Sequence, residues 1–358
     1  MNNECDILYI CGTLEYGGSV SGNYILYKTL KRINGITLKV LPVYSWNSDK
    51  EESEHFLSNS RGDIHNLSSE ELISRLPKHK VLFLSGDDMT HQQIYDVCNH
   101  FNSKFVTITM SHWIFGNTSH YPELDNDFDG ENVRIRANLY QMLDTHIIAG
   151  SSNSKFILEN SLFKNIPCTI IPFPFEEVDV YSGDVARNQK SILWGTQQPD
   201  NPRKGKAYFE KALEFLYNIC DTPDDIVIRQ IGPKSHLNTK FKVEWLGEIE
   251  NRVELSKVYK SSKVFALSTL ADAGPMMALE CIKNETPLVS FRTNISTDLV
   301  DNGKNGYITN SVEEYAEHLY SILYNDKFHM DYEYVKTFNS ESSVDIKYQN
   351  FFNTLLNK

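Results

Sequence analysis

Short apolar runs alternate with helix-like segments along the whole chain, and this alternation constrains the fold more than any other feature. Runs such as 80–85, 191–194 and 264–267 have the length and composition of buried strands. Segments such as 206–217, 276–283 and 312–323 instead place apolar residues at helical spacing. Alternation of this kind is typical of parallel sheets covered by helices on both faces. We therefore expect an α/β protein.

The chain has 358 residues, more than a single hydrophobic core usually serves, so we expect two domains. The α/β alternation occurs twice, and a polar, acidic stretch containing proline and glycine separates the two series near residues 173–184. Such a composition is typical of an interdomain connection. We predict an N-terminal domain over 1–174, a hinge over 175–188 and a C-terminal domain over 189–340, with a cleft between the domains.

Composition limits where the protein works. No apolar run approaches the roughly 20 residues that a membrane span needs, and the N-terminal sequence MNNECDILYICG lacks a basic flank and a cleavage signal. The six cysteines are scattered without a CxxC pair, as expected of reduced thiols that act as small hydrophobes. We expect a cytoplasmic protein.

The net charge of −12 disfavours binding to nucleic acid and strong adhesion to anionic lipid. Residues 1–174 carry 14 basic and 20 acidic residues, and the rest of the chain carries 21 and 27, so neither half is basic. Nucleic-acid binding, which needs a positive surface, is not expected. Residues 26–32 mix apolar and basic positions. We interpret them as an amphipathic core helix with a solvated face, and a membrane-docking helix is the alternative.

Two carboxylates, Asp272 and Glu280, flank a predicted junction from strand to helix. The residues between them include Gly274 and Pro275, which suit a tight turn and a first helical turn. Amide groups at such a helix start favour a phosphate. With a nucleotide-sugar diphosphate there, Asp272 could face sugar hydroxyls and Glu280 could accept from ribose hydroxyls. The alternative is a helix capped by Asp272 with a solvated Glu280.

Four blocks of the chain resemble a known family, the retaining GT-B-fold glycosyltransferases of sequence family 4, which use nucleotide-sugar donors. The blocks cover residues 15–32, 146–176, 194–216 and 244–310, and the last of them contains ADAGPMMALECIKNETPLVS. The resemblance implies two facing Rossmann-like domains, with the donor bound by the C-terminal domain and the acceptor by the N-terminal one. It also implies that a C-terminal helix within 341–358 crosses back to the N-terminal domain.

The resemblance assigns roles to the acidic pair and its turn. Glu280 matches the family glutamate associated with the ribose. Asp272 occupies the place of the glutamate associated with the donor sugar, and its side chain is one methylene shorter. Gly274, Pro275 and Met276 match the glycine-rich turn whose amides face the phosphates, although Pro275 has no N–H to donate.

Further roles follow from the other blocks. Lys204 matches the lysine that neutralises the departing diphosphate. Among the carboxylates near it in sequence, only Asp200 is expected to compete for its charge. The family arginine after a glycine is absent because Thr196 follows Gly195, so Arg203 is expected to replace it.

Two candidates lie in the N-terminal half. Gly18 belongs to a glycine pair expected to approach the donor phosphate and the acceptor. His112 is expected at the reacting face of the donor sugar, with Ser111 as the alternative match and a core histidine as the structural explanation.

The predicted activity is hexosyl transfer from a nucleotide sugar, such as a UDP- or GDP-sugar, to a glycan, lipid-linked or protein acceptor in bacterial surface glycoconjugate synthesis. We expect no further cofactor and no metal, and we interpret the acidic stretch 125–129 as a solvated loop. The sequence also allows contact with the inner face of a membrane or with a glycosylation complex. The alternative is an inactive accessory subunit. Three departures from the family favour it: Asp272, the missing arginine, and Glu285 in place of a family glycine.

Overall fold

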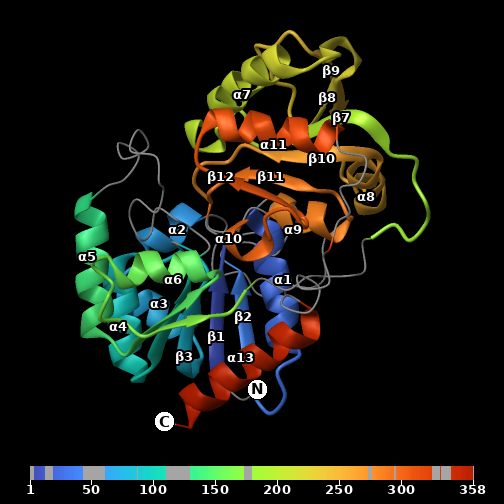
Figure 1. Ribbon diagram of the computed structural model, residues 1–358. Coiled ribbons are helices and arrows are strands. Elements are labelled where there is room, and N and C mark those ends of the chain that lie inside the picture. The colour runs from blue at the N-terminus through green and yellow to red at the C-terminus, as the bar shows by residue number, and fades with distance from the viewer. Residues whose placement is uncertain are drawn as a thin grey trace. The chain divides into compact units, whose positions relative to one another are not determined.

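The computed structural model describes residues 4–12, 19–42, 61–86, 88–109, 130–172, 180–272, 276–293, 296–324, 331 and 340–357. The described residues form two compact units (Figure 1). Unit 1 contains those up to residue 172 and those from 341 onward, and unit 2 contains those from 180 to 340. The last segment of the chain thus belongs to the same unit as the first.

Unit 1 is built on a six-stranded parallel sheet in the order β2-β1-β3-β4-β5-β6. The inner strands of this sheet are buried along most of their length because helices cover the sheet, whereas the two edge strands are mostly half-buried. The strands are β1 (Glu4–Cys11), β2 (Leu38–Pro42), β3 (Lys78–Leu84), β4 (Lys104–Ile108), β5 (Thr145–Ala149) and β6 (Cys168–Ile170).

The described helices of unit 1 are α1 (Ser19–Lys31), α2 (Arg61–Asn66), α3 (Ser69–Arg75), α4 (His91–Phe101), α5 (Gly130–Met142), α6 (Ser152–Glu159) and α13 (Glu341–Leu356). Capping boxes start α3 at Ser68 and α4 at Thr90, because each of these hydroxyls accepts a backbone N–H that the helix leaves unpaired.

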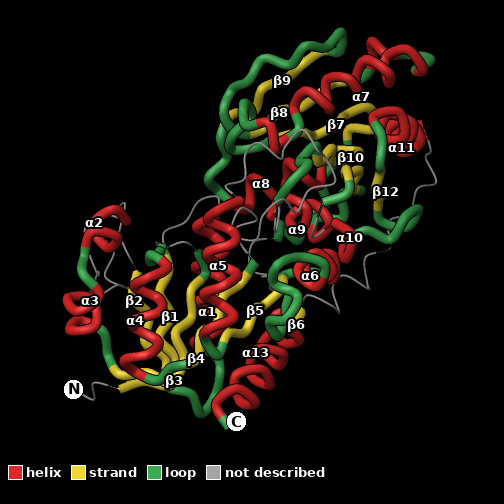
Figure 2. The backbone as a smooth tube through the Cα atoms, turned by 90° about the vertical axis from the view of Figure 1, so that its left-hand side faces the viewer, coloured by secondary structure: helices red, strands yellow, loops and turns green. Residues whose placement is uncertain are grey.

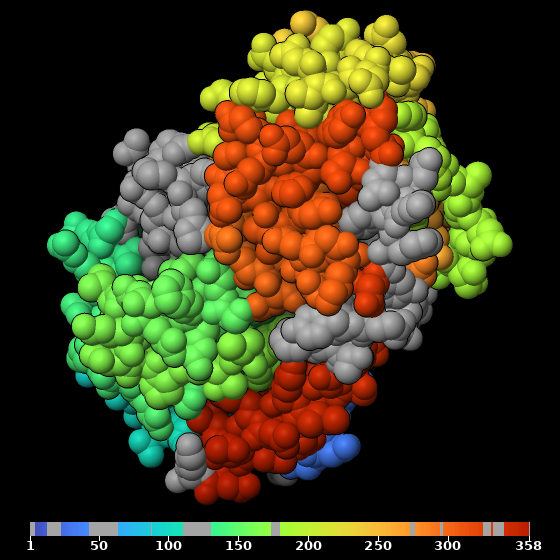
Figure 3. Space-filling model, in the orientation of Figure 1, coloured from blue at the N-terminus to red at the C-terminus, as the bar shows by residue number. Residues whose placement is uncertain are grey.

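Helix α13 packs against α1 and the sheet of unit 1, and one side of it is visible at the molecular surface (Figure 3). The Arg32 guanidinium binds both carboxylate oxygens of Asp345, at 2.7 and 2.8 Å. The Phe352 ring lies 5.9 Å from that of Phe83 on β3. An apolar contact and a bidentate ion pair therefore hold α13 in unit 1.

Unit 2 is built on a second parallel sheet, in the order β12-β11-β10-β7-β8-β9. Taken from β7 onward, this is the 3-2-1-4-5-6 order of the doubly wound dinucleotide-binding fold, in which ligands bind outside the carboxyl ends of the strands where the order reverses. The reversal lies between β7 and β10. The strands are β7 (Asn188–Gly195), β8 (Val227–Ile231), β9 (Lys242–Gly247), β10 (Ser262–Leu267), β11 (Leu288–Phe291) and β12 (Gly306–Thr309).

Helices cover both faces of this sheet (Figure 2). On one face α7 and α11 contact each other and enclose a core that includes Trp194 and Phe291. On the other face α8 and α9 contact each other and β10. The described helices of unit 2 are η3 (Pro202–Lys204), α7 (Lys206–Ile219), η4 (Pro223–Asp225), α8 (Arg252–Ser261), α9 (Met276–Lys283), α10 (Ser296–Leu299) and α11 (Val312–Tyr324).

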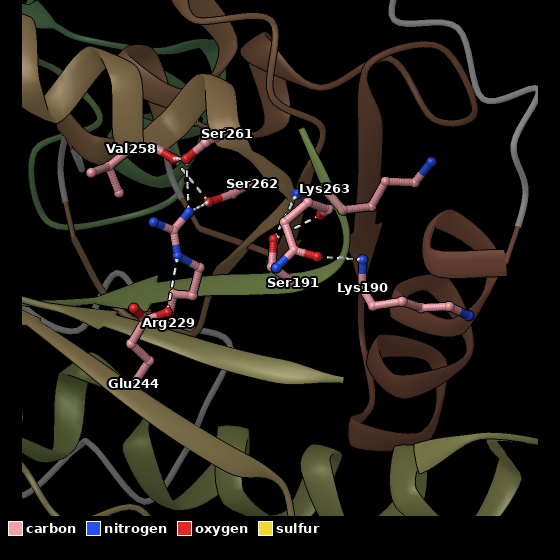
Figure 4. Close-up of polar contacts among 9 residues, drawn as sticks. Lys190, Ser191, Arg229, Glu244, Val258, Ser261, Ser262 and Lys263 are labelled. Atoms are coloured by element: carbon pink, nitrogen blue, oxygen red, sulfur yellow. Dashed lines mark hydrogen bonds and ion pairs between the residues drawn. The ribbon is translucent and has the colours of Figure 1, made fainter. Parts of the chain in front are cut away.

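A half-buried arginine anchors α8 to its neighbouring strands (Figure 4). Arg229 on β8 donates to the hydroxyls of Ser261 and Ser262, at 2.7 and 3.1 Å, where α8 ends and β10 begins. The same guanidinium lies 3.6 Å from the carboxylate of Glu244 on β9. The position of α8 on the sheet is therefore fixed by polar contacts as well as by packing.

Most predicted strands and helices are confirmed. The predicted helices 206–217 and 276–283 correspond to α7 and α9, and the predicted strand 191–194 lies inside the longer β7. Strand β12 was not predicted, because it has only four residues and is only partly apolar. Two doubly wound α/β units with parallel sheets agree with the expected fold class.

Candidate functional site

The candidate site lies at the carboxyl ends of β7 and β10, where the strand order of unit 2 reverses. The loop after β7 leads into η3, which carries Arg203 and Lys204, and the loop after β10 carries Asp272. Hydrogen bonds to backbone oxygens join the loops: Leu270 N–H donates to Arg203 O at 2.8 Å, and Ser268 Oγ donates to Lys204 O at 2.7 Å. These bonds hold together segments that are far apart in sequence.

Local sequence explains this arrangement. Asn201 accepts the backbone N–H of Arg203 at 3.1 Å and so begins η3. Gly205 ends η3 in the left-handed conformation, with φ of 67°. A Cβ at this position would lie 1.9 Å from Ser268 O. Only glycine therefore allows the two loops to approach so closely.

Lys204 and Asp272 form an ion pair in which Nζ lies 2.6 Å from Oδ2. Their side chains are 20% and 21% exposed, so water screens the pair only in part. The expectation that Asp200 is the carboxylate competing for Lys204 is wrong. Asp200 instead lies 3.6 Å from Lys206, because the meeting of two strand ends, which sequence distance does not reveal, brings Asp272 to Lys204.

Glu280, in the second turn of α9, is held by two residues of α8. Its Oε1 pairs with Arg252 Nη1, and its Oε2 accepts from the Tyr259 hydroxyl at 3.0 Å. Burial raises the pKa of the Tyr259 phenol well above its ordinary value, and the Glu280 charge raises that pKa further. Tyr259 therefore stays protonated and donates its proton to the carboxylate.

The structural alternative for Glu280 is at odds with these contacts. Asp272 pairs with Lys204, and the residues that connect it to the start of α9 at Met276 lie outside the described ones. Glu280 is half-buried and bound to Arg252 and Tyr259 rather than merely solvated. Sequence reasoning missed Arg252 and Tyr259. Their separation of two helical turns was the one available signal, since it places both side chains on the same face of α8.

The remaining predicted residues divide into two groups. Arg203 is half-buried on η3, and Met276 is half-buried as the first residue of α9. The other predicted positions lie outside the described residues: Gly18, Ser111, His112, Gly274 and Pro275. The acidic stretch 125–129 also lies outside them.

A second set of groups surrounds the carboxyl ends of β8 and β9. Trp245 is 48% exposed, and its Nε1 donates to Gly232 O at 3.0 Å. Gly232 N–H in turn donates to Gly247 O at 2.9 Å. Lys206, at the start of α7, donates to Ser235 Oγ at 2.7 Å. Cationic and aromatic groups therefore line this end of the sheet.

The described part of the chain contains no group of three or more His, Cys, Asp or Glu side chains arranged to hold a metal ion. Among the described helices, none combines the length and apolar character needed to cross a membrane.

Comparison with known families singles out the second half of unit 2. Residues 233–336 match the family model described as glycosyl transferases group 1. The group 1 match includes Arg252, Tyr259, Asp272 and Glu280, whereas Lys204 precedes it. Comparison with curated proteins finds no match.

Solved glycosyltransferase structures share the fold along nearly the whole chain. Sucrose-phosphate synthase from Thermosynechococcus elongatus superposes with a TM-score of 0.76 at 12% identity, over 98% of this chain and 99% of that one. HepE of Anabaena in complex with UDP gives 0.66 at 13% identity, over 98% and 100%. The lipopolysaccharide outer core galactosyltransferase WaaB gives 0.66 at 14% identity, over 98% and 99%. The predicted GT-B fold is thereby confirmed.

Proposed function

We propose that this protein is a retaining glycosyltransferase that moves a hexosyl group from a nucleotide-sugar donor to a glycan, lipid-linked or protein acceptor. The group 1 match and the GT-B fold support nucleotide-sugar-dependent transfer. HepE, one of the structures with this fold, is in complex with UDP, which makes a UDP-sugar the first donor to test. Synthesis of bacterial surface glycoconjugates is the role that we propose, in line with the galactosyltransferase WaaB.

The observation that carries the proposal is the position of Lys204 at the reversal point of the unit 2 sheet. A lysine held there by Ser268 and Gly205 can neutralise the charge that develops on a departing diphosphate. Asp272, beside it, is suited to accept a hydrogen bond from a hydroxyl of the transferred sugar. The ammonium group supplies the positive charge in this proposal, so we propose that no metal is required.

Retention of configuration follows in this proposal from attack on the face that the nucleotide leaves. The acceptor hydroxyl bonds to the anomeric carbon as the bond from that carbon to the phosphate oxygen breaks. The departing phosphate oxygen takes the hydroxyl proton, so no protein nucleophile is needed. Lys204 then balances the charge on the released nucleoside diphosphate.

The direct test is transfer of radiolabelled sugar from UDP-, GDP- and ADP-sugars to a panel of glycan, lipid-linked and peptide acceptors. We expect transfer by the wild-type protein and its loss in Lys204→Ala. A thermal-shift series with the free nucleoside diphosphates UDP, GDP and ADP identifies the base of the donor, because a ligand at 100 times its Kd adds about 2.7 kcal/mol to the free energy of unfolding. Absence of both transfer and nucleotide binding would contradict the proposal.

The second candidate is a catalytically inactive accessory subunit of a glycosylation complex. The observation that favours it is the Lys204–Asp272 pair, which neutralises the cation that a diphosphate would use. One of the structures with this fold is a GtfA/B complex, with a TM-score of 0.55. Nucleotide binding without turnover against every acceptor would support this second function.

A further inference from the structure

The contacts between α8 and α9 concentrate on one functional side chain. Tyr259 and Arg252 each bind one oxygen of the Glu280 carboxylate. Between them on α8, Ser256 donates to the side-chain oxygen of Asn284, the first residue after α9. Asn284 in turn donates to the backbone oxygen of Glu280 at 2.8 Å. Two of these three contacts therefore converge on the Glu280 carboxylate, and the third joins the same segments without reaching that carboxylate.

The carboxylate keeps acceptor capacity while it is held. An ionised carboxylate offers about four lone-pair positions, and these contacts use one on each oxygen. Each oxygen can therefore accept one more hydrogen bond. Two acceptors side by side in a fixed plane match a pair of neighbouring hydroxyls, such as the 2′ and 3′ hydroxyls of a ribose.

Arg252 and Tyr259 are arranged to fix the plane of the Glu280 carboxylate. Tyr259 is fully buried, and its ring lies 5.5 Å from that of Phe265 on β10. Its backbone oxygen also accepts from Thr286 Oγ1 at 2.8 Å. The phenol therefore has little freedom to move. The side chains of Arg252 and Glu280 are 22% and 19% exposed, so the carboxylate stays within reach of a ligand.

We propose that Arg252 and Tyr259 are positioning residues that orient Glu280 toward the ribose hydroxyls of the nucleotide and so make the site select ribonucleotides over deoxyribonucleotides. This inference rests on the proposed function, because it takes a nucleoside diphosphate as the ligand. The residues act through Glu280 and need no contact with the nucleotide themselves.

The test compares the Kd of UDP with that of 2′-deoxy-UDP by calorimetry, and uses GDP and ADP with their 2′-deoxy forms if UDP does not bind. Hydrogen bonds to a charged acceptor imply a preference of about tenfold or more for the ribonucleotide in the wild-type protein. We expect Tyr259→Phe and Arg252→Gln to reduce that preference by at least about threefold, because the carboxylate plane is no longer fixed. Arg252→Lys should recover part of it.

Ser256→Ala is the matched control, because it removes a contact from α8 to the residue after α9 that does not reach the Glu280 carboxylate. It should leave the preference unchanged. A merely structural role would weaken both nucleotides equally, so an unchanged preference in both Tyr259→Phe and Arg252→Gln would overturn the inference while leaving the proposed function intact. An equal fall in Ser256→Ala would overturn it too. If the wild-type protein bound none of the three ribonucleotides, the proposed function would fail and the inference with it.

Discussion

The ammonium group of Lys204 lies 2.6 Å from the carboxylate of Asp272, although 68 positions separate the two residues in sequence. The pair is half-buried at the carboxyl ends of two adjacent parallel strands, β7 and β10. A bound diphosphate would compete with Asp272 for the cation. The consequences of that competition can be measured.

Lys204→Ala should lower kcat/KM for sugar transfer by about 100- to 1,000-fold, because removing one well-placed electrostatic stabiliser typically costs about 3–4 kcal/mol of barrier. Lys206→Ala is the matched control, since Lys206 is engaged with Ser235. Initial rates with a saturating acceptor provide the measurement. Comparable losses in the two variants would show that overall basic charge matters rather than Lys204 itself.

Asp272→Asn should separate binding from transfer. Without the carboxylate, Lys204 is no longer neutralised, so the free nucleoside diphosphate should bind at least as tightly as it does to the wild-type protein. Transfer should fall by at least about tenfold, because a hydrogen bond from the donor sugar to a charged acceptor is weakened. Calorimetry and initial rates on the same preparation check both effects. A large loss of nucleotide affinity would contradict this account of the pair.

Gly205→Ala should destabilise unit 2 by several kcal/mol, as the added methyl group meets Ser268 O and the residue keeps a left-handed backbone. Gly35→Ala separates these two causes. Gly35 has φ of 73° and nothing within 4 Å of an added Cβ, so its substitution should cost only about 1 kcal/mol. Urea unfolding of both variants gives the comparison, and equal costs would rule out the steric explanation.

Glu285→Gly should stabilise the protein by about 1 kcal/mol. Glu285 follows α9 with φ of 57°, a conformation that is costly for residues with a Cβ and free for glycine. Its backbone oxygen accepts from Arg187 at 2.8 Å, a bond that survives the substitution, whereas the attraction between its side-chain charge and Arg187 is lost. Glu285→Ala keeps the strain, so it should bring no such gain. The free energy of unfolding in urea is the readout, and a loss of stability in the glycine variant would oppose the prediction.

The stability of unit 1 should decline in acid partly through Asp6. Burial acts to raise the pKa of this carboxyl, but hydrogen bonds from Lys80 and Thr37 outweigh it and lower the pKa from 3.8 to about 2. A lowered pKa in the folded state means that the contribution is complete above about pH 4 and is lost as the pH falls through about 2. The stability difference between wild type and Asp6→Asn should shrink over that interval. A difference independent of pH would refute the assignment.

The regular structure of this chain was largely predictable, and the contacts within its site were not. Buried parallel strands are apolar runs that a sequence displays directly, and the helix at 276–283 was predicted with its observed bounds. The Lys204–Asp272 pair depends on β10, rather than only β8, being a neighbour of β7. Sheet order is a long-range property that no local pattern encodes.

The same limit applies to Glu280. Its acidic character and its sequence separation from Asp272 were visible in the sequence. Its partners, however, come from α8, and strand β10 lies between α8 and α9 in the chain. The spacing of Arg252 and Tyr259 gives them a common face on α8, but which helix meets that face is decided by packing on the sheet. Glu285 is a different case, because its left-handed backbone agrees with the glycine usual at that position in the resembling family.

The place of α13 has a consequence for biosynthesis. This helix covers Phe83 and binds Arg32. The sheet of unit 1 leaves the ribosome first, so it lacks part of its apolar cover until every residue of unit 2 has been translated. Unit 2, whose described strands and helices form one continuous stretch, can fold before unit 1 is finished. Nascent chains stalled before residue 341 should therefore recruit chaperones through the uncovered surface of β3 and α1.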